Sequence, residues 1–401
     1  MDRFDITYFH GPFEEYILRP GVLDGIVASG MTLLPLCYGT ETNKAVLRLL
    51  GERWPGVRAI VHDPRFGEVY ASKKPARADE AMRDIVEDYG SLAALCGWDI
   101  VDEPSAADFP VLGAMVKALR RYSPGLETTV NLFPNYATPA QLGTPDYEEY
   151  LERFIREVSP DYLSYDHYHF MGRKDARHTA SCCDERERLI REAAMNTQER
   201  AGFFTNAEQV RTAALRHGLP AMMIALLTEH GPYRNLTRAE LLWESNMCLC
   251  YGFKRLSYFT YWEPYHDDFW RWANAMCDTE GRPMPHYYDI QAIAAQLRPV
   301  GELLYRLRSA GVWRIGGAAE PLFHSAEPGC GLPALEGDNG VAGLFDDGSV
   351  YLVNRDCGAP NRFVLPADGL LRFEPAARRF VPAPRELLLE AGEAALLRPM
   401  R

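Results

Sequence analysis

The segment 98–104, WDIVDEP, ends an apolar run with two adjacent carboxylates, Asp102 and Glu103. Successive side chains of a strand point to opposite faces, so both can point inward only where Pro104 ends the regular ladder. Adjacent carboxylates repel each other, and burial raises the pKa of a carboxyl group. A glutamic acid that stays protonated near neutral pH is what a general acid at a glycosidic oxygen requires.

A further carboxylate, Glu229, closes another apolar run in the segment 221–231, AMMIALLTEHG. An isolated buried charge is costly, so this carboxylate must be solvated in a cleft or have a partner. Opposite strands of one barrel can hold two carboxylates about 5 Å apart, the spacing that serves retaining glycosidases. In such a pair, one carboxyl group is the acid/base and the other is the nucleophile. Two plainer interpretations stay open: a surface Asp102–Glu103 pair before a helix, and a Glu229 that caps a helix or pairs with an arginine.

An aromatic segment, 257–265 (SYFTYWEPY), follows later in the chain. Aromatic faces at the mouth of a pocket suit the apolar C–H faces of a sugar ring. Trp262 is the predicted sugar-binding tryptophan, whereas Phe259 and Trp272 are expected to pack in the core. Glu263, next to Trp262, is a further carboxylate that competes for the role of nucleophile.

Short apolar runs alternate with amphipathic stretches over the first three quarters of the chain. Eight runs have the character of strands: 5–10, 32–38, 58–62, 98–102, 128–133, 162–168, 222–228 and 255–261. Helical periodicity follows most of them, at 78–96, 109–122, 147–158, 239–251 and 287–307. This α/β alternation predicts a parallel sheet with helices outside it, and eight units favour a closed (β/α)8 TIM barrel. No GxGxxG follows the first strand, which disfavours a dinucleotide-binding fold.

In such a barrel the reacting groups lie at the C-terminal ends of the strands. The polar and aromatic residues that end the predicted strands are therefore the candidates for substrate binding. Besides the two glutamates, they are His10, Tyr38, Asp102, Asn131, Asp166, His167, Tyr168, Trp262 and Glu263. A purely structural end of the barrel would not need this concentration of ionisable and aromatic side chains.

The composition and the hydrophobic pattern of the sequence change near residue 309. Glycine and proline punctuate short runs there, and the runs 343–345 and 350–353 flank Asp346-Asp347-Gly348 as in a hairpin. Further strand-like runs occur at 362–365, 370–373, 379–381 and 394–397. We predict a catalytic barrel over 1–308 and a small antiparallel β-sandwich over 309–401.

Composition excludes several classes of function. Lys and Arg total 43 against 55 Asp and Glu, a net charge of -12, which disfavours binding to nucleic acid or to an anionic membrane. We expect a cytoplasmic protein, because the sequence shows no signal segment and no apolar stretch of membrane-spanning length. The nine cysteines show no paired CxxC motif at zinc spacing, and we expect no cofactor.

The Asp-Glu-Pro motif at 102–104 resembles the Asn-Glu-Pro that carries the acid/base glutamate in the clan of retaining (β/α)8 glycoside hydrolases that includes families 5 and 42. The resemblance implies that Glu103 is the acid/base, Glu229 the nucleophile and Trp262 the tryptophan beneath the first sugar, with an oligosaccharide or glycoside as substrate. It also implies β-galactosidase-like specificity. One residue departs from the motif, since Asp102 stands where the clan has an asparagine that hydrogen-bonds the sugar 2-hydroxyl.

Two other interpretations stay open. The density of histidines and carboxylates, such as Asp166-His167 and Glu229-His230, would also suit a metal-dependent barrel enzyme, a sugar isomerase or a hydrolase. The departure at Asp102 would suit a carbohydrate-binding barrel that has lost turnover.

Overall fold

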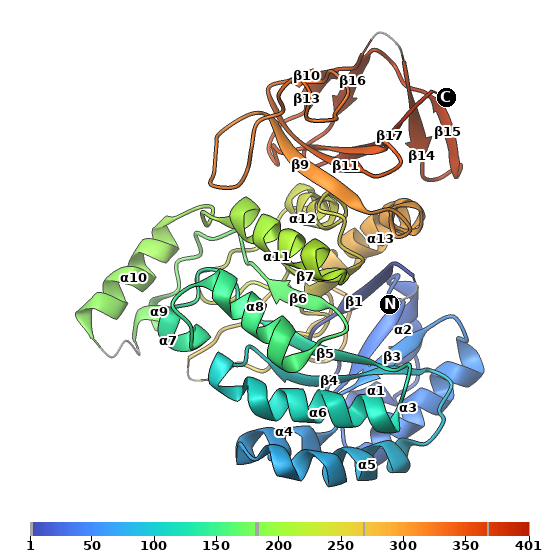
Figure 1. The fold of residues 1–401 in the computed structure, drawn as a ribbon, viewed down its shortest axis with the longest axis vertical. Helices are drawn as coiled ribbons and strands as arrows, with labels where there is room; N and C mark the ends of the chain where they lie inside the picture. Colours follow the sequence, from blue (N-terminus) through green and yellow to red (C-terminus); the bar gives the residue numbers. More distant parts are fainter. Residues whose placement is uncertain (1–2, 181–183, 268, 367–368, 401) are drawn as a thin grey trace.

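A computed structural model describes residues 3–180, 184–267, 269–366 and 369–400. Figure 1 shows two parts, a barrel formed by the first three quarters of the chain and a β domain. The β domain sits on the side of the barrel formed by α11 (Phe203–His217), α12 (Arg238–Cys250) and α13 (Pro285–Leu304). Both predicted architectures, the (β/α)8 barrel and the antiparallel β-sandwich, are confirmed.

Eight parallel strands form the barrel in the order β1-β8-β7-β6-β5-β4-β3-β2. Their bounds are β1 (Asp5–Tyr8), β2 (Leu33–Leu36), β3 (Arg58–Val61), β4 (Leu95–Asp102), β5 (Glu127–Leu132), β6 (Leu163–Asp166), β7 (Ala221–Leu226) and β8 (Arg255–Phe259). The amide of Thr32, just before β2, donates to the carbonyl of Ile6 in β1 at 2.9 Å and brings the two edge strands together. Most strands are buried along their length because helices cover the outside of the barrel.

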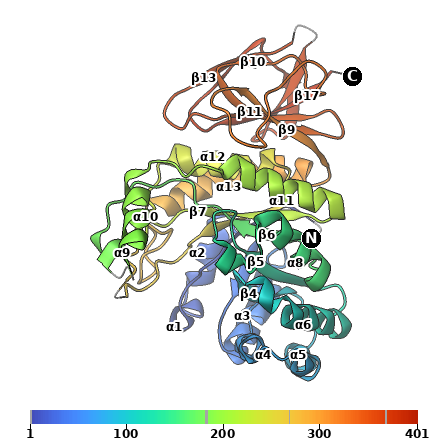
Figure 2. The same cartoon turned by 60° about the vertical axis from the view of Figure 1, so that its left-hand side comes forward.

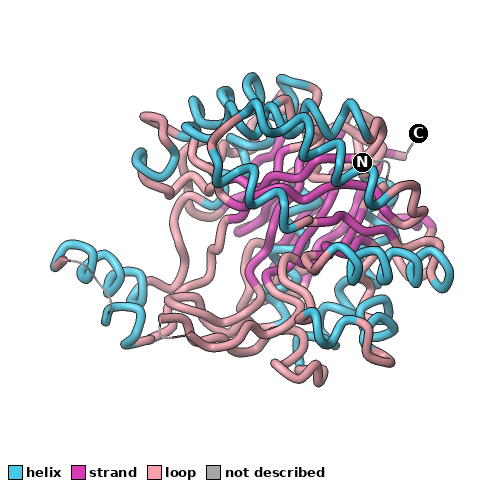
Figure 3. Tube along the Cα trace, turned by 90° about the horizontal axis from the view of Figure 1, so that it is seen from below, coloured by secondary structure: helices cyan, strands magenta, loops and turns pink. Residues whose placement is uncertain are grey.

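Helices lie around the outside of the strands (Figure 3). They are α1 (Glu14–Ile17), α2 (Val22–Ala28), α3 (Thr40–Arg53), α4 (Pro64–Ser72), α5 (Ala78–Tyr89), α6 (Phe109–Tyr122), α7 (Pro139–Leu142), α8 (Tyr147–Val158), α9 (Ala176–Ala180), α10 (Glu185–Asn196), α11 (Phe203–His217), α12 (Arg238–Cys250) and α13 (Pro285–Leu304), with 3-10 turns at Pro75–Arg77 and Ala106–Asp108. α9 and α10 belong to the long connection after β6 and project from the side of the barrel (Figure 2).

The helix predicted over 78–96 is too long. In the structure it ends at Tyr89, because Gly90 takes a left-handed φ of 54° and closes the last turn with a hydrogen bond to Val86. Leu95 and Cys96 then begin β4, so the apolar residues at the end of the predicted helix belong to the strand. The helix predicted over 287–307 likewise ends earlier, at Leu304.

The C-terminal part packs a six-stranded sheet, β15-β14-β17-β12-β11-β9, against a three-stranded sheet, β10-β13-β16. The strands are β9 (Ser309–Gly316), β10 (Glu336–Gly337), β11 (Asn339–Phe345), β12 (Val350–Asn354), β13 (Asn361–Val364), β14 (Leu370–Glu374), β15 (Arg379–Pro382), β16 (Glu386–Leu389) and β17 (Ala394–Pro399). A separate apolar core, with Leu352, Phe363 and Leu387, lies in this part. The predicted hairpin around residues 346–348 is formed by β11 and β12. The exact domain division at residue 308 stays a prediction.

Buried polar contacts join the two parts through α12. The Tyr351 hydroxyl in β12 donates to Asn246 Oδ1 at 2.6 Å, and Asn246 Nδ2 donates to the Gly392 carbonyl at 2.9 Å. Gly343 in β11 lies directly against the carbonyl of Cys250 at the end of α12. The sandwich is therefore docked by close backbone contact and not only by side chains.

Replacing Gly343 by alanine is expected to destabilise this junction by about 1–3 kcal/mol, because the new Cβ would collide with the Cys250 carbonyl and backbone cannot rotate away. Thermal unfolding followed by circular dichroism measures the effect. Gly56→Ala is the matched control, since a Cβ there meets nothing within 4 Å. Equal melting temperatures for the two variants would contradict the close docking.

Candidate functional site

A pocket of about 470 Å³ opens at the C-terminal ends of the barrel strands. Its walls combine three carboxyl groups with a larger number of aromatic rings. The lining residues are Phe9, Asp102, Glu103, Asn131, Phe133, Pro134, Tyr136, Ala137, Gln141, Asp166, Tyr168, Ile224, His230, Tyr233, Phe259, Trp270 and Trp272. This is the size and composition of a small-molecule site.

The end of β4 brings two consecutive carboxyl groups into this pocket. The pairing of β4 with β5 shifts register between Asp99 and Val101, which marks a bulge. Glu103 then adopts a left-handed φ of 44°, and its amide donates to the Asn131 carbonyl at 2.9 Å. A regular strand would send Asp102 and Glu103 to opposite faces, whereas this distortion lets both line the pocket. A strained residue of this kind is typical of a functional site.

Asn131, at the end of β5, holds the carboxyl groups of two neighbouring strands. Its Nδ2 donates to Asp102 Oδ1 and to Asp166 Oδ1, both at 3.0 Å, and its Oδ1 accepts from the Ser164 hydroxyl at 2.9 Å. The amide thus uses both of its N–H groups on carboxyl oxygens. The result is a fixed arrangement in which Asp102 and Asp166 flank one asparagine.

The three carboxyl groups of the pocket all have raised pKa values. Burial is the main cause for Glu103, and the charges of Asp166 and Asp102 raise its pKa further, so that it stays protonated at neutral pH. Burial and the neighbouring Asp102 raise the pKa of Asp166. Asp102 faces the solvent of the pocket but is surrounded by protein on its other sides, and this burial raises its pKa. A protonated glutamic acid beside two further carboxyl groups is equipped to donate a proton.

Aromatic rings form the side of the pocket that faces these carboxyl groups along β7 and β8. Trp272 stacks on His230 with ring centroids 4.8 Å apart, and Trp270 lies 5.8 Å from Trp272. Phe259, at the end of β8, lies 5.9 Å from Trp272 and 5.4 Å from Tyr168. These flat apolar surfaces suit a sugar ring.

The aromatic residues that line the pocket differ from those expected from the sequence. Trp262 is only 2% exposed, packs against Tyr16 and donates through Nε1 to the Thr279 carbonyl at 3.2 Å, so it lies in the core. Phe259 and Trp272, expected in the core, line the pocket instead. The reason is the path of the chain after β8, which turns Trp262 towards α1 and brings the later Trp270 and Trp272 back over the mouth.

Four other candidates also lie outside the lining. Tyr38 is buried and donates to the Pro12 carbonyl at 2.9 Å, and His167 is buried with Nδ1 at 3.0 Å from Asn206 Oδ1. His10 is exposed, but its ring contacts Phe9, a lining residue, edge to face. Glu263 is half-buried, and its amide donates to the Cys277 carbonyl. Asp102, Asn131, Asp166 and Tyr168 are the substrate-binding candidates that the fold gathers around Glu103.

Glu229 is not a lining residue of the pocket, although it is close in the fold to two that are, His230 and Trp272. It precedes His230, and its backbone pairs with Ala273, which follows Trp272. Its carboxylate accepts from Arg173 Nε at 2.8 Å and from Asn274 Nδ2 at 2.6 Å, and the side chain is 21% exposed. The pairing with an arginine, one of the interpretations left open by the sequence, is therefore present. Glu103 and Glu229 approach the mouth of the barrel from β4 and β7.

Three rings of the wall are Tyr136, Tyr233 and His230. The first two were not among the predicted site residues, and His230 was considered only for the metal-dependent alternative. All three stand in loops within a few residues of a strand end, at 134–136 and 230–233. Arg200, from the long connection after β6, covers Tyr136 at 3.8 Å and donates to the Tyr233 hydroxyl at 3.1 Å. The sequence feature that could have identified these rings is their position only a few residues after the ends of β5 and β7.

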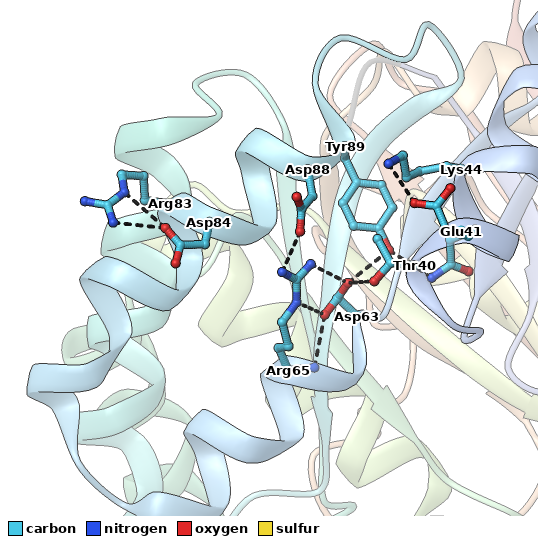
Figure 4. A network of polar contacts seen from close by, with 10 residues as sticks. Thr40, Glu41, Lys44, Asp63, Arg65, Arg83, Asp84, Asp88 and Tyr89 are labelled. Atoms are coloured by element: carbon cyan, nitrogen blue, oxygen red, sulfur yellow. Dashed lines mark hydrogen bonds and ion pairs between the residues drawn. The ribbon is translucent and has the colours of Figure 1, made fainter.

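The polar residues after β3 form a structural network and not a metal site. Asp63 caps α4 by accepting from the Arg65 amide, and it also accepts from the Arg65 side chain, Thr40 and Tyr89 (Figure 4). Within the described ranges, no group of three or more His, Cys, Asp and Glu side chains has the arrangement of a metal site. The metal-dependent interpretation thus has no ligand set in the described part of the chain. No helix within that part is both long and apolar enough to cross a membrane.

Solved structures with a similar fold include several glycoside hydrolases. A glycoside hydrolase family 5 protein from Bacteroides vulgatus ATCC 8482 superposes with a TM-score of 0.60 at 9% identity, covering 98% of this chain and 89% of that one. Another glycoside hydrolase gives 0.58 at 9% identity, over 98% and 92% of the two chains. A beta-galactosidase from the psychrophilic Marinomonas ef1 gives 0.51 at 10% identity over 76% of this chain, which spans only 62% of that protein. No family model and no curated relative matches the sequence. These likenesses show that the chain shares the (β/α)8 fold of these solved structures.

Replacing Glu103 by glutamine is expected to stabilise the protein at alkaline pH. A raised pKa means that the folded state binds the proton of Glu103 more tightly than the unfolded chain does. The contribution of this proton to stability is complete below the unfolded pKa of about 4.3, and it is lost as the pH rises towards the folded pKa. A glutamine at this position has no proton to lose and carries no such cost. Thermal melting should give a variant that is a few degrees more stable than the wild type at pH 8 and equal to it at pH 4. A variant less stable than the wild type at pH 8 would contradict the raised pKa.

Proposed function

We propose that this protein is a glycoside hydrolase that cleaves β-glycosidic bonds with retention of configuration. The observation that carries the proposal is Glu103, a half-buried glutamic acid with a raised pKa, in a pocket with walls of Trp270, Trp272 and Phe259. A protonated carboxyl group beside surfaces that fit a sugar ring is the equipment for donating a proton to a glycosidic oxygen.

In the proposed first step, Glu229 attacks the anomeric carbon and the bond from that carbon to the glycosidic oxygen breaks. Glu103 gives its proton to the departing oxygen, and the sugar becomes an ester of Glu229. In the second step, Glu103 takes a proton from water, the water oxygen attacks the anomeric carbon, and the ester bond breaks. Water is consumed, and both carboxyl groups return to their starting states.

The hydrogen-bond partners of Glu229 support its proposed role as the nucleophile. Arg173 and Asn274 both donate hydrogen bonds to its carboxylate. They also fix its position next to His230 and Trp272. To reach an anomeric carbon in the pocket, the carboxylate must turn towards Glu103 while keeping one of these donors. Asp166 lines the pocket, and it is therefore the carboxyl group to test beside Glu229 for the role of nucleophile.

A panel of 4-nitrophenyl α- and β-glycosides tests the proposal. Because one structural neighbour is described as a beta-galactosidase, the panel includes β-galactosides beside β-glucosides, β-mannosides and β-xylosides. The expected result is release of nitrophenol from at least one β-glycoside and from no α-glycoside. Turnover of α-glycosides alone, or of no glycoside at all, would overturn the proposal.

A further inference from the structure

The described residues that line the pocket include acidic side chains but no lysine or arginine. These acidic side chains are Asp102, Glu103 and Asp166. Arg200 contacts Tyr136 and Tyr233, and Arg173 pairs with Glu229. The charge of Arg200 opposes the rise in the pKa of Asp166, but burial and Asp102 outweigh it. His230 adds no positive charge at neutral pH, because burial lowers its pKa to about 4.

Asn131 leaves the carboxyl pair incompletely satisfied. It donates to one oxygen of Asp102 and one of Asp166, and no other side chain of the described residues donates to either group. An ammonium group has three N–H donors and no acceptor, which matches two neighbouring carboxyl groups that each accept only one side-chain hydrogen bond, from Asn131. A bound cation would also relieve the repulsion and burial that raise the pKa of both groups.

A separate observation shows that the pocket is built for a polar ligand. The His230 ring lines it, is only 4% exposed, and has Nδ1 at 2.7 Å from the Thr228 carbonyl. Nδ1 therefore carries the proton of the neutral ring, and Nε2 is an acceptor that has no partner in the described part of the chain. A hydroxyl of a ligand resting on Trp272 would satisfy it. This places a sugar ring against the tryptophans with its polar edge towards the carboxyl groups.

We propose that the pocket selects glycosides whose sugar carries a protonated amine on the carbon next to the anomeric carbon, that is, 2-amino-2-deoxy sugars. This inference rests on the proposed glycosidase function. We place the amine on this carbon because Asp102 and Glu103 are adjacent and both line the pocket, so the sugar substituent nearest the glycosidic oxygen is the one within reach of Asp102. The aromatic wall adds to the selection, because the faces of indole rings attract cations.

The test compares matched 4-nitrophenyl glycosides at pH 6, where the amine is protonated. Each pair consists of a 2-amino-2-deoxy-β-glycoside and its parent with a 2-hydroxyl, in the galacto and in the gluco series, together with the 2-acetamido compound. We expect kcat/KM at least 10-fold higher for the amine than for the parent or the acetamide. Asp102→Asn should lower this ratio at least 10-fold, Asp166→Asn gives an independent second test, and the exposed Asp24→Asn should keep the wild-type ratio.

The outcomes separate the inference from the function beneath it. Hydrolysis of the parent glycosides with no preference for the amine would overturn the inference and leave the proposed function standing. If no glycoside is hydrolysed, calorimetry with the free 2-amino-2-deoxy sugars and their parents decides. Amine-specific binding that Asp102→Asn abolishes would support the inference without the function. Equal or absent binding of the two sugars would overturn the inference.

Discussion

Replacing Glu103 by glutamine is expected to lower kcat/KM at least 10³-fold on β-glycosides with poor leaving groups, such as methyl or unsubstituted phenyl glycosides. Proton donation by a positioned side chain contributes about 10²–10⁴-fold, and glutamine has no proton of suitable acidity to give. A dinitrophenyl glycoside needs no such help, because its leaving group departs as a stable anion. Its first bond cleavage should therefore remain fast in the variant.

The leaving-group series separates this role from a structural one. A defect in folding or binding would slow all substrates alike, whereas loss of the acid slows them in the order of the leaving-group pKa. Glu87→Gln, an exposed substitution on α5, is the matched control and should behave as the wild type. A uniform loss across the series would remove Glu103 from the role of acid.

Replacing Glu229 by alanine is expected to reduce turnover by several orders of magnitude, since the first bond to the anomeric carbon can no longer form. The change also leaves room beside Arg173 and Asn274, two donors that can hold a small anion. Added azide should then attack the anomeric carbon and restore release of the dinitrophenyl group, giving a glycosyl azide of inverted configuration. The measurement is the rate with and without azide, with the product identified by NMR.

Asp166→Ala is the comparison for this experiment. Asp166 shares the pocket with Glu103 but accepts a hydrogen bond from Asn131. We expect its loss to weaken catalysis without any rescue by azide. Wild-type turnover in Glu229→Ala, or rescue by azide in Asp166→Ala alone, would transfer the role of nucleophile to Asp166.

The barrel could be predicted from the sequence because its strands are continuous apolar runs buried by helices on the outside. Each of the eight predicted runs overlaps a strand of the structure. Predicted bounds were less accurate where a helix and a strand share apolar residues, as at Leu95. Periodicity alone does not separate a buried helix end from a strand start, and the left-handed Gly90 was the signal that does so.

The carboxyl side of the pocket was predictable for a related reason. Asp102, Asn131 and Asp166 stand at strand ends, where the barrel fixes their position, and the fold brings them together around Glu103. The bulge that turns Asp102 and Glu103 the same way was only indicated by Pro104. The repulsion between them was predictable, but its size depends on burial that only the three-dimensional structure supplies.

The aromatic side could not be predicted, because loops form it. Whether Trp262 or Trp272 reaches the pocket depends on how the segment after β8 folds back, and nothing in the local sequence determines that path. The same holds for Glu229, whose partners Arg173 and Asn274 come from two separate loops. Phe259, at the end of β8, shows that a place in a strand does not by itself decide whether a ring faces the core or the pocket.

The proposed roles of Glu103 as acid/base and Glu229 as nucleophile are tested most directly by mass spectrometry of the Glu103→Gln variant after mixing with a dinitrophenyl β-glycoside. The first step should proceed on this activated substrate, while the second step lacks its base, so the glycosyl-enzyme should accumulate. We expect a mass gain of one sugar residue, carried by the peptide that contains Glu229. A variant with no adduct, or with the sugar on any other carboxyl group, would contradict the proposed pair.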